Sequence, residues 1–97
     1  METPVLVINN EQQQQFQAIV HEELAYLEYR WLKEDLALMH TFVPESLEGK
    51  GLASALAKFA LEYAKGKNLR VIVYCPFVAT YLKRHPEYNF LVKNPGS

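Results

Sequence analysis

The sequence has little of what would crosslink the chain or anchor it in a membrane. One cysteine among 97 residues cannot form a disulfide within the chain, so we expect a reducing compartment. No apolar run approaches the roughly 20 residues that a membrane-spanning helix needs. The N-terminus lacks the basic segment and apolar core of a signal peptide. We therefore expect a cytoplasmic protein with no membrane partner.

An excess of charge of one sign is also absent. Ten basic and 11 acidic residues are interspersed and give a formal net charge of −1, so we expect no nucleic-acid partner. The three histidines lack the spacing of a metal site, and no metal is expected. The hydrophobic share of 49% is ordinary for a folded chain, and no linker or repeat divides it. Residues 1–97 should therefore form one domain.

Hydrophobic periodicity predicts a mixed sheet with helices packed on it. Apolar runs predict strands at residues 5–8, 16–20, 25–31, 36–43 and 69–75, with a turn at Asn9-Asn10 and hairpins at residues 21–23 and 33–35. Apolar residues three or four apart predict a helix from Gly51 to a stop at Gly66, and a short one around residues 77–82. The order β-β-β-β-α-β-α predicts an α/β (α+β) fold. Its sheet should be mostly antiparallel, with the strand at residues 36–43 central and the last strand parallel to it.

Two glycines flank a lysine between the fourth predicted strand and the first predicted helix. Gly49 and Gly51 would let the backbone approach a ligand closely, and the helix start beyond them offers unpaired N–H groups and partial positive charge. With Lys50 adding a full charge, this segment is a candidate phosphate or pyrophosphate loop. It matches neither the Walker nor the Rossmann glycine pattern. On two glycines alone, a tight turn with no ligand is an equally good interpretation.

The glycine loop and three further motifs, taken in order, resemble those of one known family. The segment Glu48-Gly-Lys-Gly-Leu-Ala53 resembles the Arg/Gln-x-x-Gly-x-Gly/Ala loop with which the GNAT N-acetyltransferase superfamily wraps the pyrophosphate of acetyl-CoA. The likeness is closer to small stand-alone GNAT-like proteins, through His40-Thr-Phe-Val-Pro44, Cys75-Pro-Phe77 and His85-Pro-Glu-Tyr88. It runs from about residue 16 to 88, and the predicted element order agrees with a trimmed GNAT fold. Glu48 departs from the pattern, because a carboxylate beside a pyrophosphate is electrostatically unfavourable.

The resemblance implies a site for acetyl-CoA as cosubstrate. The pantetheine arm would lie between the fourth and fifth strands, with Phe42 and Val43 on one side and Tyr74 and Cys75 on the other. Lys50 is the first choice among the basic residues that could meet the phosphates. The loop residues expected to bind the cofactor are Leu47, Glu48, Gly49, Lys50, Gly51, Leu52 and Ala53.

Three residues are candidates for catalysis. Cys75 matches a cysteine that has been proposed as an acetyl-accepting nucleophile in the small GNAT-like group, although a free cysteine is more often an inert buried residue. His40 is expected either as a hydrogen-bonded core histidine or as the base that activates Cys75. Tyr81 falls near the position where many GNAT enzymes protonate the leaving thiolate, but it also lies on the apolar stripe of its helix.

The resulting hypothesis is an acetyl-CoA-dependent acetyltransferase that acts on an amine. Residues 9–15 are too few for the two helices that wall the acceptor site in full-size GNAT domains, so the acceptor side should be open. An open acceptor side favours the amine of a protein or peptide. The alternatives are a non-catalytic acyl-CoA-binding module or sensor, and a structural domain whose glycines serve only the turn.

Overall fold

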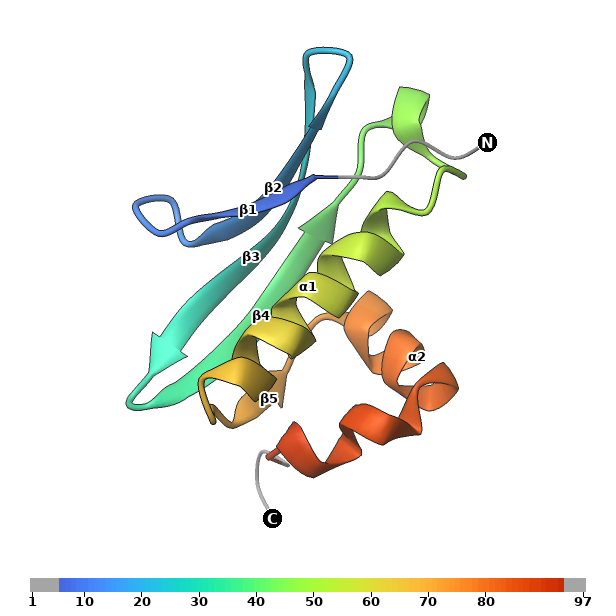
Figure 1. The fold of residues 1–97 in the computed structure, drawn as a ribbon. Helices are drawn as coiled ribbons and strands as arrows, with labels where there is room; N and C mark the ends of the chain where they lie inside the picture. The colour runs from blue at the N-terminus through green and yellow to red at the C-terminus, as the bar shows by residue number, and fades with distance from the viewer. Residues whose placement is uncertain (1–5, 94–97) are drawn as a thin grey trace.

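The computed structural model describes residues 6–93, which form a five-stranded sheet with α1 packed across one face (Figure 1). Strands β1 (Val7–Asn10), β2 (Gln15–Val20), β3 (Glu23–Leu32) and β4 (Asp35–Phe42) form an antiparallel meander. Helix α1 (Leu52–Gly66) leads to β5 (Val71–Val73), which pairs with β4 in parallel, and α2 (Pro76–Arg84) follows. The predicted fold class, element order and parallel last strand are confirmed. Two short 3-10 helices, η1 (Glu45–Leu47) and η2 (Pro86–Leu91), were not predicted.

An aromatic cluster holds α1 against the sheet. The Phe16 ring lies 4.7 Å from that of Tyr29 on β3, and 5.5 Å and 5.4 Å from those of Phe59 and Tyr63 on α1. The helix buries three alanines on the side that faces the sheet, which allows close approach. Within residues 6–93, no helix is both long and apolar enough to cross a membrane.

The first strand lies further along the chain than the sequence predicts. The prediction placed it at residues 5–8, of which Val5 lies outside the described residues, and made Asn9-Asn10 a turn. Both asparagines instead belong to β1, and the turn comes at residues 11–14. Cross-strand polar contacts explain the difference: the Tyr29 hydroxyl donates to Asn9 Oδ1 at 2.8 Å, and the Asn10 amide donates to Gln17 Oε1 at 3.3 Å.

A β-bulge in β4 changes which residues of that strand face α1. Glu28 pairs with His40, but the next residue of β3, Tyr29, pairs with Leu38, so Met39 has no partner on β3. Leu38, before the bulge, faces the core. After the bulge, Thr41 pairs with the buried Leu27 and also faces the core side of the sheet. His40 is therefore turned to the face of the sheet away from α1.

A pocket at the splayed end of the sheet

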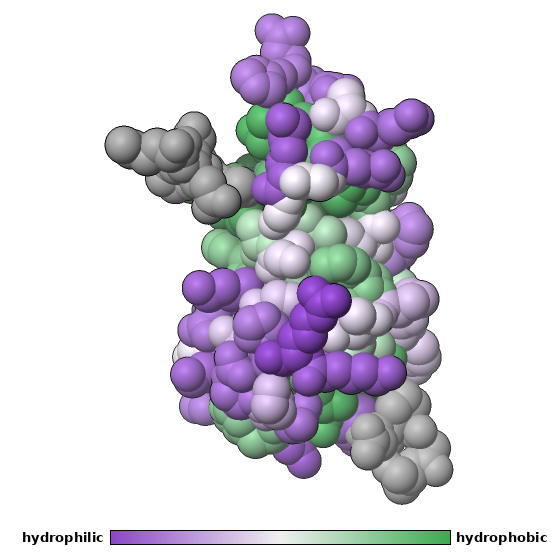
Figure 2. Space-filling view, turned by 90° about the vertical axis from the view of Figure 1, so that its right-hand side faces the viewer, coloured by the Kyte–Doolittle hydropathy of each residue, from purple (hydrophilic) through white to green (hydrophobic). Residues whose placement is uncertain are grey.

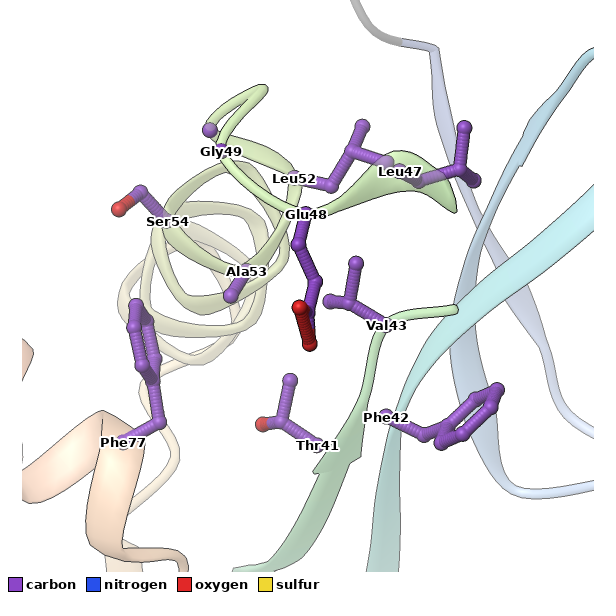
Figure 3. A pocket seen from close by; sticks show the side chains of 11 residues that line it. Thr41, Phe42, Val43, Leu47, Glu48, Gly49, Leu52, Ala53, Ser54 and Phe77 are labelled. Atoms are coloured by element: carbon purple, nitrogen blue, oxygen red, sulfur yellow. The ribbon is translucent and has the colours of Figure 1, made fainter. Parts of the chain in front are cut away.

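β4 and β5 separate after three residue pairs. Leu36–Leu38 pair with Val71–Val73, and the carbonyl oxygen of Leu38 then accepts the N–H groups of both Tyr74, at 2.9 Å, and Cys75, at 3.0 Å. The predicted strand at residues 69–75 is thereby shortened at both ends. Beyond this point lies a pocket of about 470 Å³, which we call the loop pocket (Figure 3). Its lining residues are Thr41, Phe42, Val43, Leu47, Glu48, Gly49, Gly51, Leu52, Ala53, Ser54 and Phe77.

The loop requires glycine for its backbone conformation. Gly49 has φ +80° and Gly51 has φ +77°, a left-handed region in which a side chain is strained. A Cβ added at either glycine would meet no atom within 4 Å. The glycines therefore do not relieve crowding inside the protein, and the space beside them is open to a ligand.

The start of α1 supplies unpaired donors to the wall of the loop pocket. Gly51 is the N-cap residue and provides no side-chain cap, and the first turn has no acidic residue. The first N–H groups of a helix lack intrahelical acceptors and carry the positive end of the helix dipole. Here these groups belong to the pocket-lining residues Leu52, Ala53 and Ser54. This wall suits an anionic group.

Glu48 points into the loop pocket. Figure 3 shows its carboxylate directed between Ala53 and Val43 towards Thr41. No hydrogen bond or ion pair links it to another residue in the described part of the chain. Lys50 is exposed and is not among the lining residues, so the one full charge that lines the pocket within residues 6–93 is negative.

Cys75 is buried behind the wall of the pocket. It is 2% exposed, and its sulfur lies 3.1 Å from Oγ1 of Thr41, which does line the pocket. Tyr74, its neighbour, is 49% exposed and lies outside the pocket wall. Of the two residues predicted for the β5 side of the gap, Cys75 is therefore the one that adjoins the pocket.

His40 lies neither in the core nor beside Cys75. Its position therefore contradicts both predicted roles, the hydrogen-bonded core histidine and the base that activates Cys75. Its side chain is exposed on the face away from α1, where its ring packs edge-on against Tyr26 at 6.4 Å. Thr41 lies beside the sulfur of Cys75 because the bulge at Met39 reverses which residues of β4 face each side of the sheet. An imidazole on the far face cannot take a proton from Cys75 directly.

Tyr81 lies in a second pocket and not at the loop pocket. This pocket, also of about 470 Å³, is lined by Lys58, Glu62, Lys65, Tyr81, His85, Glu87 and Tyr88. We call it the helix pocket. The Tyr81 ring stacks on His85 at 4.2 Å, and burial raises the pKa of its hydroxyl, with smaller contributions from Glu87 and Glu62. The geometry does not bring this hydroxyl to the gap between β4 and β5.

The loop pocket brings together most of the predicted cofactor residues and adds three. Thr41, Ser54 and Phe77 line it and were not predicted. Ser54 was foreseeable, because it belongs to the first turn of the helix after the glycines. Phe42 contributes to the wall, but its ring points away from the pocket (Figure 3) and packs on Tyr26 at 5.5 Å. The predicted residues that line the pocket are Phe42, Val43, Leu47, Glu48, Gly49, Gly51, Leu52 and Ala53, while Lys50 and Tyr74 do not.

Comparison with known proteins identifies the family. The chain is 31% identical to Protein NATD1 of Mus musculus over 91 residues, which cover 91% of this chain and 83% of the relative. It is 30% identical to Protein NATD1 of Homo sapiens, covering 91% and 80%. The solution structure of a GCN5-like protein from Staphylococcus aureus matches with a TM-score of 0.71 at 26% identity, covering 93% of this chain and 89% of that one. The model of the GCN5-related N-acetyltransferase family matches residues 15–91, and the chain belongs to that family.

Proposed function

We propose that the protein binds acetyl-CoA in the loop pocket and transfers the acetyl group to an amine of a protein or peptide. The main support is that one pocket joins the unpaired N–H groups at the start of α1 to the gap between β4 and β5. The N–H groups suit a pyrophosphate. The gap suits a narrow apolar arm ending in a thioester, which would reach Thr41 and the residues next to Cys75.

The proposed reaction is direct. The unprotonated amine attacks the carbonyl carbon of the thioester, the carbon–sulfur bond breaks, and an amide forms. The amine loses a proton, and the thiolate of CoA gains one. The carbonyl oxygen gains negative charge in the transition state, so a backbone donor beside it would accelerate the step. The bulge at Met39, where the β3–β4 pairing is interrupted next to the gap, is the candidate source of that donor.

An open acceptor side favours a macromolecular amine. β1 and β2 are joined by the turn at residues 11–14, with no helix between them. The sheet face away from α1 carries exposed apolar side chains at Ile8, Ile19, Leu24 and Phe42. An acceptor presented on a protein surface would have room to approach this end of the sheet.

Transfer of radiolabelled acetyl from acetyl-CoA to a panel of peptides, free amino acids and polyamines tests the proposal. We expect turnover with at least one lysine-containing or N-terminal peptide, and a higher melting temperature with CoA, because a ligand that binds only the folded state stabilises it. Absence of both effects would contradict the proposal.

The second candidate function is a non-catalytic acyl-CoA-binding module. The carboxylate of Glu48 inside the pocket favours it, as does the position of His40 and Tyr81 away from the gap. A melting temperature that rises with CoA, without transfer to any amine in the panel, would favour this module over the enzyme.

A further inference from the structure

Four exposed apolar side chains lie on the sheet face away from α1, at the end where β4 and β5 separate. They are Ile8 on β1, Ile19 on β2, Leu24 on β3 and Phe42 on β4. By contrast, Figure 2 shows hydrophilic side chains gathered over the lower half of the side where α2 and η2 lie in Figure 1. We call the four residues, together with Tyr26, the sheet patch.

Cross-strand pairing makes the sheet patch continuous. Tyr26 on β3 pairs with Phe42 on β4, and their rings lie 5.5 Å apart. The Ile19–Leu24 pair of β2 and β3 lies next to them, nearer the β2–β3 turn. Directly paired residues share a face of the sheet, so these side chains form two adjacent apolar rows.

Gln17 extends the sheet patch to β1 without adding free polar groups. It pairs with Tyr26 on one side and with Ile8 on the other, and its side chain is buried. Its amide oxygen accepts from Asn10 at 3.3 Å, and its amide nitrogen donates to Gln15 at 2.8 Å. Because both ends of this amide are engaged, a partner that covers the sheet patch does not leave it without hydrogen bonds. The surface therefore suits apolar groups.

Acidic residues border the sheet patch at the same end of the molecule. Residues 21–24, around the β2–β3 turn, and residues 44–51, after β4, together carry four glutamates and one lysine. The Ser46 hydroxyl donates to Glu23, so these two segments lie side by side. Glu48, another of the four, points into the loop pocket (Figure 3). This border is complementary to a cationic partner.

Phe42 joins the sheet patch to the loop pocket. Its ring points away from the pocket, yet the residue is part of the pocket wall (Figure 3). From β4 to β1 the sheet patch spans three strand spacings, about 14 Å, which roughly four residues of extended chain cover. Every second side chain of such a chain faces the sheet. A lysine at the gap between β4 and β5 therefore places the side chains two and four residues away over the sheet patch.

We propose that the sheet patch binds the acceptor, and that the acceptor is a basic peptide segment with apolar side chains two and four residues from the acetylated lysine. This inference rests on the proposed function and names its substrate class. The lysine reaches the gap beside Phe42, and the apolar side chains cover Tyr26 and Ile19. The basic residues of the segment face the acidic border.

Steady-state transfer to two matched peptides tests the proposal. Each peptide has a blocked N-terminus, one central lysine and flanking arginines, with either leucine or glutamine two and four residues from the lysine on both sides. We expect the wild-type kcat/KM to be roughly tenfold higher for the leucine peptide, on the scale of burying part of an apolar side chain. Ile19→Gln should reduce this ratio to about threefold or less. Ile19 is 64% exposed, so the variant should fold normally.

Leu32→Gln is the matched control for Ile19→Gln. It also replaces an exposed apolar side chain of the sheet, but at the end of β3 far from the sheet patch, and it should keep the wild-type ratio. Equal use of the two peptides by the wild-type protein would overturn the inference and leave the proposed function standing. An Ile19→Gln variant that keeps the wild-type ratio would also overturn the inference.

A leucine peptide with glutamates in place of the arginines tests the acidic border. We expect its kcat/KM to be several-fold lower than that of the arginine version at low salt, because like charges repel. The difference should shrink as salt rises and screens the charges. Equal use of the two peptides at low salt would overturn the basic character assigned to the acceptor.

Sedimentation of the free protein tests the other occupant of such a face, a second copy of the chain. A wild-type dimer that Ile19→Gln converts to a monomer would assign the sheet patch to self-association and overturn the inference. We expect a monomer in both cases. A wild-type protein that binds CoA but acetylates none of the peptides would overturn the proposed peptide acceptor, and the inference with it.

Discussion

The sulfur of Cys75 lies 3.1 Å from the hydroxyl of Thr41, whereas His40, the residue before Thr41, lies on the opposite face of the sheet. A nucleophilic cysteine needs a neighbour that favours the thiolate, such as an imidazole or a cation. In the described part of the chain the hydrogen-bonding partner of this sulfur is a neutral hydroxyl. The pair therefore favours a packing role for Cys75 beside the gap.

We expect Cys75→Ala to keep near-normal turnover and near-normal CoA affinity. The substitution removes the thiol but little volume, and direct attack by the amine does not use the sulfur. Steady-state transfer assays, with urea unfolding to verify that the variant is folded, check this prediction. A variant that binds CoA normally but loses turnover would contradict it. An acetyl group mapped to Cys75 by mass spectrometry in the wild-type protein would then support the two-step route.

Glu48→Gln should tighten CoA binding. The carboxylate points into the loop pocket, where it would repel a pyrophosphate, and the amide keeps its size without the charge. The expected gain is a few-fold, because an exposed charge contributes about 1 kcal/mol or less, and it should shrink as salt rises. Calorimetry at two salt concentrations measures it. Glu45→Gln, an exposed residue of η1 outside the pocket wall, is the control and should change little.

Substitutions at Gly51 should separate backbone strain from ligand clash. Gly51→Ala should lower the free energy of unfolding by about 1 kcal/mol, since its φ of +77° is unfavourable for a side chain. Gly51→Asn should lose less, because asparagine tolerates this conformation better. Both should weaken CoA binding by filling the open space beside the loop. An asparagine variant with wild-type CoA affinity would show that the ligand does not approach Gly51.

The sequence predicted the order of elements because that order depends on periodicity, which β2, β3, α1 and α2 display clearly. The loop was also foreseeable, since glycine marks the positive φ at Gly49 and Gly51. The orientation of His40 could not be predicted from the sequence. Plain alternation from Leu38 would turn His40 to the core, and only the pairing with β3 reveals the bulge that turns Thr41 there instead. The second pocket was equally hidden, because its walls come from segments that meet only in the folded chain.

The Tyr88–Glu62 contact should make stability fall at alkaline pH. The hydrogen bond to Glu62, and then burial, raise the pKa of Tyr88 above its ordinary 10.0. A group whose pKa is raised in the folded state contributes its full stabilisation below its pKa in the unfolded state, near 10 for tyrosine. That stabilisation is lost as the pH rises through the pKa in the folded state. Burial likewise raises the pKa of Tyr29 and Tyr81, so all three tyrosines should contribute to the loss.

Tyr88→Phe tests the largest of these contributions. At neutral pH the variant should be less stable by about 1–2 kcal/mol, because Glu62 loses its donor. Between pH 9 and about pH 11 its free energy of unfolding should fall less steeply than that of the wild-type protein, since one perturbed tyrosine is gone while Tyr29 and Tyr81 remain. Urea unfolding across this range measures both effects. Tyr74→Phe removes an exposed hydroxyl with no hydrogen-bond partner among residues 6–93, and it serves as the control for the loss of a phenol. An unchanged slope in Tyr88→Phe would mean that the hydroxyl does not hold its proton against Glu62 in solution.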